Sequence, residues 1–133
     1  MNTIRLLIIC FLISSFVSSC SKGYGTWYIQ KNLTVYYTNK NDLKLAKKLA
    51  DYWFVNGLIG VKSQSIRVFN VDNKNRQVQL IALKKLDVNS LKFEEIEEIQ
   101  KLENDLNKTI FKDNKVDVVI CDSRFNVTND LNY

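Results

Sequence analysis

Four segments of the chain have the hydrophobic pattern of β-strands. They are "LTVYYT" (33–38), "QSIRVFNV" (64–71), "RQVQLIAL" (76–83) and "KVDVVICD" (115–122). The first is rich in β-branched and aromatic residues, and the last is a nearly continuous apolar run of the kind found in strands that are covered on both faces. The second and third are separated by "DNKN", whose Asp and Asn side chains favour a tight turn. This middle pair therefore predicts a β-hairpin.

Two longer segments have the repeat of amphipathic helices. In residues 39–60, one face collects the apolar residues Ala46, Leu49, Ala50, Trp53 and Phe54. In residues 90–111, the apolar stripe is Ile96, Ile99, Leu102, Leu106 and Ile110. Asn41 or Asp42 is placed to cap the first helix, and Gly57 to end it. Glu94 and Glu95 suit the positive N-terminal end of the second helix.

The order of these elements is β-α-β-β-α-β, which predicts an α+β domain of the ferredoxin-like class. In that arrangement a four-stranded antiparallel sheet carries both helices on one face. Phe125 and Val127, in the tail, are compatible with one short additional edge strand. A chain of 133 residues is long enough for one such domain. We expect it to span residues 33–133.

The composition narrows the chemistry that the domain can perform. The chain contains no histidine, which removes the commonest general base and the commonest metal ligand. Its net charge of +5 is modest, and its lysines are spread along the chain instead of being clustered with aromatic residues for nucleic-acid binding. We therefore expect no metal, no cofactor and no nucleic-acid partner.

The N-terminal segment "MNTIRLLIICFLISSFVSSC" has the layout of a secretory signal. One positive charge at Arg5 precedes an apolar stretch from Leu6 to Val17, and small residues follow at Ser18 and Ser19. The apolar stretch is shorter than the roughly 20 residues that a permanent membrane-spanning helix needs. A cleaved signal is therefore the better interpretation.

The end of this segment, "VSSC", resembles the lipobox of bacterial lipoproteins. An aliphatic residue at Val17 and two small residues precede Cys20, although the family more often has leucine at the first position and alanine or glycine before the cysteine. The resemblance covers the first 20 residues and implies that Cys20 receives a diacylglycerol thioether, that the chain is cut before it, and that acyl chains such as palmitate anchor the protein stably. It divides the chain into a signal peptide (1–19), a lipidated tether (20–32) and the domain.

The same resemblance implies a location in the bacterial cell envelope. Ser21 follows the cysteine where an aspartate would signal retention in the inner membrane, so the outer membrane is favoured, with the domain facing the periplasm. Of the three cysteines, Cys10 leaves with the signal and Cys20 is acylated. Cys121 then has no partner within the chain, and its apolar surroundings predict a buried, unreactive thiol.

Two groups of polar residues are candidates for chemistry. The acidic cluster on the second helix comprises Glu94, Glu95, Glu97, Glu98, Glu103 and Asp105. It alternates with lysines opposite an apolar face, which is typical of a solvated surface. Asp122 follows the last predicted strand, where active-site residues often lie, but no nucleophile and base are recognisably paired with it, and we expect it to anchor a turn. The sequence therefore predicts no catalytic residue.

These observations favour a small lipoprotein that acts without catalysis as a binding or envelope-assembly component. Its partners would be the membrane, through the lipid on Cys20, and an envelope protein that contacts the open face of the sheet. One alternative is an immunity or inhibitor lipoprotein that blocks a toxin or an envelope hydrolase. Another is a carrier of a small ligand or lipid in a pocket between the sheet and the helices.

Overall fold

The computed structural model describes residues 23–81, 91–112 and 115–129. Its elements are β1 (Thr26–Gln30), β2 (Leu33–Tyr37), the 3-10 turn η2 (Lys40–Asp42), α2 (Leu43–Val55), β3 (Gln64–Asn70), β4 (Asn75–Ile81), α3 (Phe93–Thr109), β5 (Lys115–Cys121) and β6 (Val127–Asn129). The six strands form one sheet in the order β1-β2-β3-β4-β5-β6. Neighbours are alternately antiparallel and parallel, so that β2 runs parallel to β3 and β4 parallel to β5. The signal segment, Cys20 and the first residues of the expected tether lie outside the described residues.

The predicted ferredoxin-like fold class is wrong. The sheet has six strands instead of four and is mixed instead of antiparallel. Each helix connects two parallel strands that are direct neighbours, β2 with β3 and β4 with β5. Hydrophobic periodicity locates strands along a chain, but it does not say which strands pair, and this is where the prediction failed.

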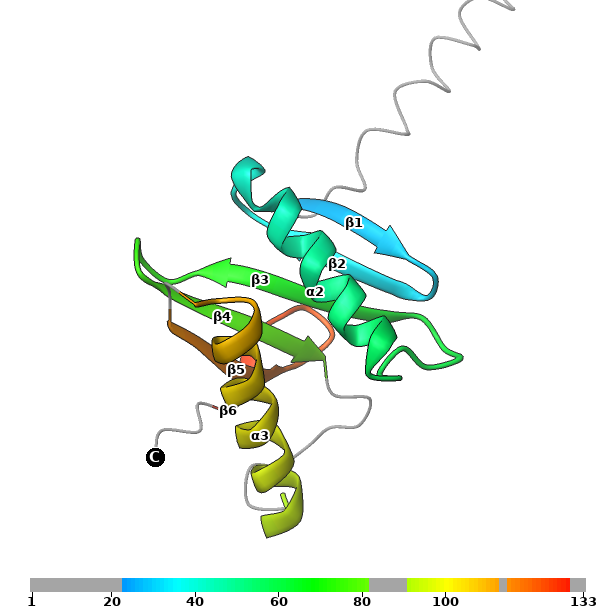
Figure 1. Ribbon diagram of the computed structural model, residues 1–133, viewed down its shortest axis with the longest axis vertical. Coiled ribbons are helices and arrows are strands. Elements are labelled where there is room, and N and C mark those ends of the chain that lie inside the picture. Colours follow the sequence, from blue (N-terminus) through cyan, green and yellow to red (C-terminus); the bar gives the residue numbers. More distant parts are fainter. Residues whose placement is uncertain (1–22, 82–90, 113–114, 130–133) are drawn as a thin grey trace, which may run out of the picture.

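Both helices cover the same face of the sheet, which we call the helix face (Figure 1). The alternation of side chains along each strand places one apolar set under the helices. From the strands this core contains Leu33, Val35, Tyr37, Ile66, Val68, Val78, Val116 and Val118, and from α2 it contains Ala46, Leu49, Ala50 and Trp53. The helix α3 adds Leu106 as its buried residue. Phe54, which the pattern placed in the stripe of the first helix, is instead 46% exposed.

The part of the expected tether that begins at Thr26 is strand β1 instead. A two-residue turn at Lys31, which has a positive φ of 53°, brings β1 back along β2. Gly25, directly before β1, allows the chain to pass close to the backbone of Tyr37 in β2. Its φ is +93°, and a side chain at this position would collide with the backbone carbonyl oxygen of Tyr37.

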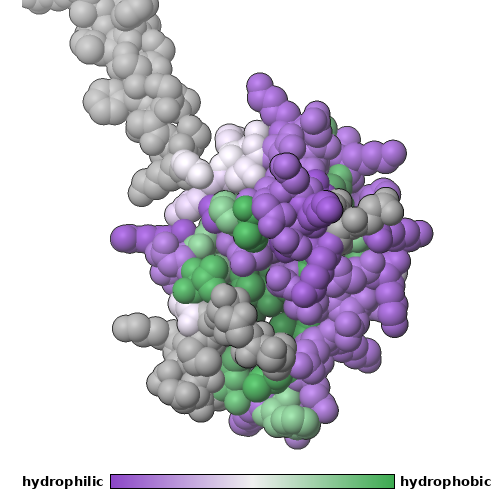
Figure 2. All heavy atoms as spheres, turned by 90° about the vertical axis from the view of Figure 1, so that its left-hand side faces the viewer, coloured by the Kyte–Doolittle hydropathy of each residue, from purple (hydrophilic) through white to green (hydrophobic). Residues whose placement is uncertain are grey.

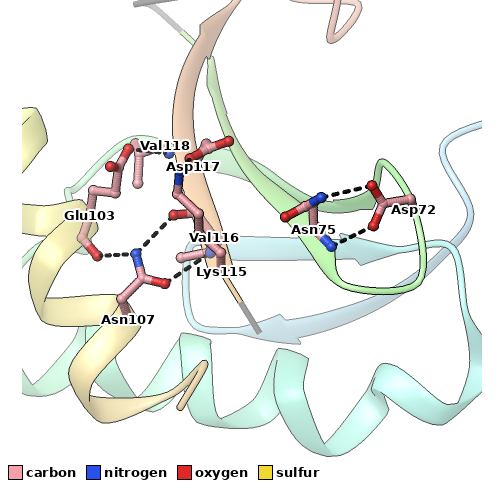
Figure 3. A network of polar contacts seen from close by, with 8 residues as sticks. All are labelled: Asp72, Asn75, Glu103, Asn107, Lys115, Val116, Asp117 and Val118. Atoms are coloured by element: carbon pink, nitrogen blue, oxygen red, sulfur yellow. Dashed lines mark hydrogen bonds and ion pairs between the residues drawn. The ribbon is translucent and has the colours of Figure 1, made fainter. Parts of the chain in front are cut away.

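At the opposite end of the sheet, α3 covers the edge of β5. The side-chain amide of Asn107 accepts a hydrogen bond from the Val116 backbone N–H at 2.9 Å and donates one to the Val116 carbonyl oxygen at 2.9 Å (Figure 3). The carboxylate of Glu103 accepts a hydrogen bond from the Val118 N–H at 3.0 Å. These side chains satisfy backbone groups that β6, a strand of three residues, does not pair. This edge of the sheet is therefore protected.

The turn between β3 and β4 is organised by Asp72. Its carboxylate accepts a hydrogen bond from the backbone N–H of Lys74 at 2.7 Å. It also accepts one from the backbone N–H of Asn75 at 2.8 Å and one from the Asn75 side chain at 2.7 Å (Figure 3). These hydrogen bonds, above all that from Lys74, lower the pKa of Asp72. The turn predicted from "DNKN" is thus confirmed, with the side-chain-to-backbone bonds that favour such residues in turns.

Candidate functional site

The candidate site lies on the face of the sheet opposite the helices, which we call the helix-free face. Its side chains alternate with those of the core and come from the middle strands, with Arg67 and Phe69 on β3 and Gln77 and Gln79 on β4. Two aromatic residues from outside the strands, Tyr24 and Phe125, pack onto this face. The helix-free face is therefore partly covered.

Three aromatic rings form a triangle on this face. Tyr24, Tyr36 and Phe125 pack edge to face, with ring centroids 5.2 to 5.8 Å apart and interplanar angles of 71 to 73°. Phe125 has a positive φ of 60°, a conformation that a bulky residue rarely adopts, and its side chain is 5% exposed. The ring is buried against Val119 and Cys121 of β5, and this packing offsets the strain of the backbone conformation.

The guanidinium of Arg67 lies among these rings. Its central carbon is 4.9 Å from the ring centroid of Phe69, 5.1 Å from that of Phe125 and 5.9 Å from that of Tyr24. Aromatic faces attract a cation and are favoured stacking partners of arginine. Burial in this setting lowers the pKa of Arg67, while Cys121 and Tyr24 act in the opposite direction.

A chain of side-chain hydrogen bonds holds the guanidinium in place. Arg67 Nε donates to Gln79 Oε1 at 2.7 Å, and Gln79 Nε2 donates to Gln77 Oε1 at 3.1 Å. Gln79 is 2% exposed, so its amide is fixed by the surrounding sheet. The two terminal nitrogens of Arg67 make no hydrogen bond within the described residues.

No carboxylate neutralises Arg67 in the part of the chain that the structure describes. The ion pairs found there join Arg76 to Asp42 at 3.0 Å and Lys115 to Asp117 at 3.7 Å. A charge that is partly removed from water is normally paired. Arg67 thus combines a fixed orientation with free donors, which is the arrangement that binds a carboxylate or phosphate oxygen.

Cys121 lies beside Arg67 in the sheet. The thiol is fully buried and unpaired. Burial raises its pKa to about 11, against the opposite effect of Arg67. The predicted burial of this cysteine is confirmed, and a raised pKa disfavours the thiolate, which is the reactive form.

Asp122 anchors a turn, as predicted. Its carboxylate accepts hydrogen bonds from the backbone N–H groups of Arg124 and Asn126, at 2.8 and 2.9 Å, and from the Asn126 side chain at 2.9 Å. The hydrogen bonds from Asn126 have the largest effect and lower the pKa of Asp122. This turn also positions Phe125, so Asp122 contributes to the helix-free face indirectly.

Three members of the acidic cluster on α3 make different structural hydrogen bonds. Glu95 accepts a hydrogen bond from the backbone N–H of Lys92 at 2.9 Å and so caps the start of the helix. Glu103 binds the β5 edge, and Asp105 accepts a hydrogen bond at 2.9 Å from the Tyr52 hydroxyl of α2. The described residues contain no group of acidic residues or cysteine that would hold a metal ion.

A hollow of about 620 Å³ lies between α2 and α3 on the helix face. Apolar and polar side chains both line it: Leu58, Leu91, Ile99, Leu102 and Ile120, together with Tyr52, Asn56, Glu95, Glu98, Lys101 and Asp105. A second hollow of about 370 Å³ shares Leu58 and Leu102 with it and extends to Trp53, Ile66 and Leu80. Together these hollows form a groove between α2 and α3 with an apolar floor that includes Leu58 and Leu102.

Large apolar side chains also reach the surface away from the groove. Figure 2 shows hydrophobic atoms exposed on one side of the molecule between hydrophilic regions. The outermost strand β1 exposes Trp27 by 52% and Ile29 by 59%. In the described part of the chain, neither α2 nor α3 has the length and hydrophobicity that a membrane-spanning helix requires.

Comparison with known proteins found no match to a family model, a curated protein or a solved structure. Functional residues are therefore identified from the geometry of this chain. The sequence pattern did not identify Arg67 and Gln79 as site residues. One sequence feature could have identified Arg67. It lies between Ile66 and Val68 in the otherwise apolar segment "IRVF", so its side chain points to the opposite face of the strand from theirs.

Proposed function

We propose that this protein is a lipid-anchored component of the bacterial envelope that binds a partner without catalysing a reaction on it. Its contact surface is the helix-free face, and Arg67 receives a carboxylate or phosphate group of the partner. The observation that supports this proposal is the fixed guanidinium without an acidic partner among the described residues.

In this proposal, Cys20 is acylated as in bacterial lipoproteins and anchors the protein to the membrane. Six residue steps separate Cys20 from Thr26, the first residue of β1. Even a fully extended chain of that length reaches only about 20 Å. The domain would thus stay next to the outer membrane on its periplasmic side, and its partner would be a protein of that surface.

Metabolic labelling tests the anchor. Cells that express the full chain receive a clickable fatty acid, and the protein is analysed for the label after purification. The wild type should carry the label and Cys20→Ala should not, whereas Cys121→Ala serves as the control that removes a buried cysteine. Equal labelling of wild type and Cys20→Ala would contradict acylation at Cys20.

Site-specific photocrosslinking tests the contact surface. One photoreactive residue replaces Ser65, which shares the helix-free face with Arg67, and in a second variant it replaces Lys48, which is exposed on α2. Irradiation of intact envelopes should join one discrete protein to the first variant and not to the second. The same product from both positions would contradict the helix-free face as the contact surface.

The apolar groove between α2 and α3 favours a second candidate function, the transport or storage of a small apolar ligand. Leu102 lines both hollows, so Leu102→Trp would fill them. For a carrier, native mass spectrometry of the full chain from cells should detect a bound small molecule in the wild type and lose it in Leu102→Trp. Wild-type protein without any bound mass would exclude this alternative.

A further inference from the structure

Among the residues that the structure describes, no strand lies beside the outer edge of β1. In the sheet order, β1 and β6 are the two edge strands. At the β6 end, the edge strand has three residues, its register with β5 is shifted near Ile120 and Cys121, and side chains of α3 bind the exposed backbone of β5. The β1 end is built differently: five residues pair with β2 in unbroken register.

Three of the usual protections of an edge strand are missing from the described residues of β1. Its sequence "TWYIQ" contains no charged residue and no proline, and it has no bulge. Proteins normally place such features on an edge to prevent pairing with another chain. Along an antiparallel pair, alternate residues direct their backbone N–H and C=O groups away from the partner strand, so β1 presents outward backbone groups that no described strand pairs.

We propose that β1 pairs with β1 of a second copy of this chain in antiparallel orientation, around a two-fold axis at Tyr28. Because β1 has an odd number of residues, this register uses the whole strand: Tyr28 faces Tyr28, and Trp27 of each copy faces Ile29 of the other. Pairs of an aromatic and a β-branched residue are among the stabilising cross-strand pairs. Both members are now more than half exposed.

Charge and hydrogen bonding both favour a second copy of the chain as the strand that pairs with the edge of β1. The flanking Lys31 would face Gly25 of the other copy, so the two lysines lie at opposite ends of the interface and no like charges meet. Thr26 of one copy faces Gln30 of the other. Gln30 Oε1 is buried without a hydrogen-bond partner among the described residues, and the threonine hydroxyl brings a donor next to it.

The dimer has a consequence for the binding surface. A two-fold axis through paired antiparallel strands stands perpendicular to the sheet, so the two sheets of six strands join into one. Both helix-free faces then point to the same side. This pairing does not depend on the proposed partner binding, which a monomer can perform equally well.

Two double variants of the full chain test the pairing, because the register places residue 27 opposite residue 29. In Trp27→Lys with Ile29→Lys, lysines face lysines across the interface. In Trp27→Lys with Ile29→Glu, each lysine faces a glutamate. Both variants replace the same two exposed apolar side chains, and circular dichroism verifies that both are folded. Analytical ultracentrifugation in detergent measures the dissociation constant of the dimer.

The wild type should form a dimer, and the lysine–lysine variant should raise the dissociation constant at least about tenfold relative to the lysine–glutamate variant. A monomeric wild type would overturn the proposal. Equal dissociation constants for the two variants would overturn it as well, because the charges would then not face each other. Loss of partner crosslinking with the dimer intact would contradict the proposed function only.

Discussion

Arg67 Nε donates a hydrogen bond of 2.7 Å to Gln79 Oε1, across the strand pair β3 and β4. Gln79 is buried in the sheet and is oriented by its own bond to Gln77. The guanidinium is therefore positioned before any partner arrives, and its remaining donors are not used by the described part of the chain. Preorganisation of this kind lowers the entropic cost of binding.

Replacing Gln79 tests whether it holds the guanidinium. Gln79→Leu keeps the side-chain volume but leaves Arg67 Nε without its acceptor. Because hydrogen bonds to charged groups contribute about 1.5–3 kcal/mol, the free energy of unfolding should fall by about 2 kcal/mol in urea titrations. Gln77→Leu, which removes only an acceptor of Gln79, should cost less. An unchanged stability of Gln79→Leu would show that this bond does not position Arg67.

The ion pair of Asp42 and Arg76 should stabilise the fold far more than that of Lys115 and Asp117. The Asp42 side chain is 7% exposed and binds Arg76 at 3.0 Å, while the Asp117 side chain is 48% exposed. Asp42→Asn leaves the arginine charge partly buried without compensation and should cost about 3 kcal/mol. Asp117→Asn should cost less than about 1 kcal/mol. Equal losses in chemical denaturation would contradict this difference in burial.

A glycine should be required at position 25, where the chain passes the Tyr37 backbone before β1 begins. Gly25→Ala forces a methyl group against the backbone of Tyr37 and should lower the stability by about 2 kcal/mol or more. Gly23 also has a positive φ, but a side chain there would meet no atom within 4 Å. Gly23→Ala is thus the matched control and should cost less in thermal unfolding. The reverse order would mean that β1 does not lie against β2 as described.

The contact between α2 and α3 should make the stability sensitive to alkaline pH. Burial, and then the hydrogen bond to Asp105, raise the pKa of Tyr52 from 10.0 to about 12. A pKa that is higher in the folded protein stabilises it below pH 10 and loses this contribution as the pH rises from about 10 to 12. Urea unfolding as a function of pH should therefore show a smaller decline over this range for Tyr52→Phe than for the wild type. Identical declines would exclude this role of Tyr52.

The helices and the turn between β3 and β4 were predictable because each depends on residues close together in the sequence. The periodic apolar residues located α2 and α3, and Asp and Asn in "DNKN" located the turn between β3 and β4. Leu49 and Leu106 were correctly placed in the core. Strand pairing was not predictable, because it depends on contacts between segments far apart in the sequence.

The candidate site was missed for a related reason. Its residues come from β3, β4 and the segments around Tyr24 and Phe125, and they meet only after the sheet forms. β1 was missed because its two neighbouring glycines and mixed aromatic residues are typical of a tether. The role of Gly25 becomes visible only once Tyr37 is placed beside it.

Partner binding at the helix-free face should depend on the charge of Arg67. In photocrosslinking from position 65, Arg67→Gln should lower the yield of the partner product at least about tenfold, since losing one member of a buried charge pair costs several kcal/mol. Arg124→Gln removes the same charge from an exposed turn and should leave the yield unchanged. Equal yields from the wild type and both variants would contradict a binding surface centred on Arg67.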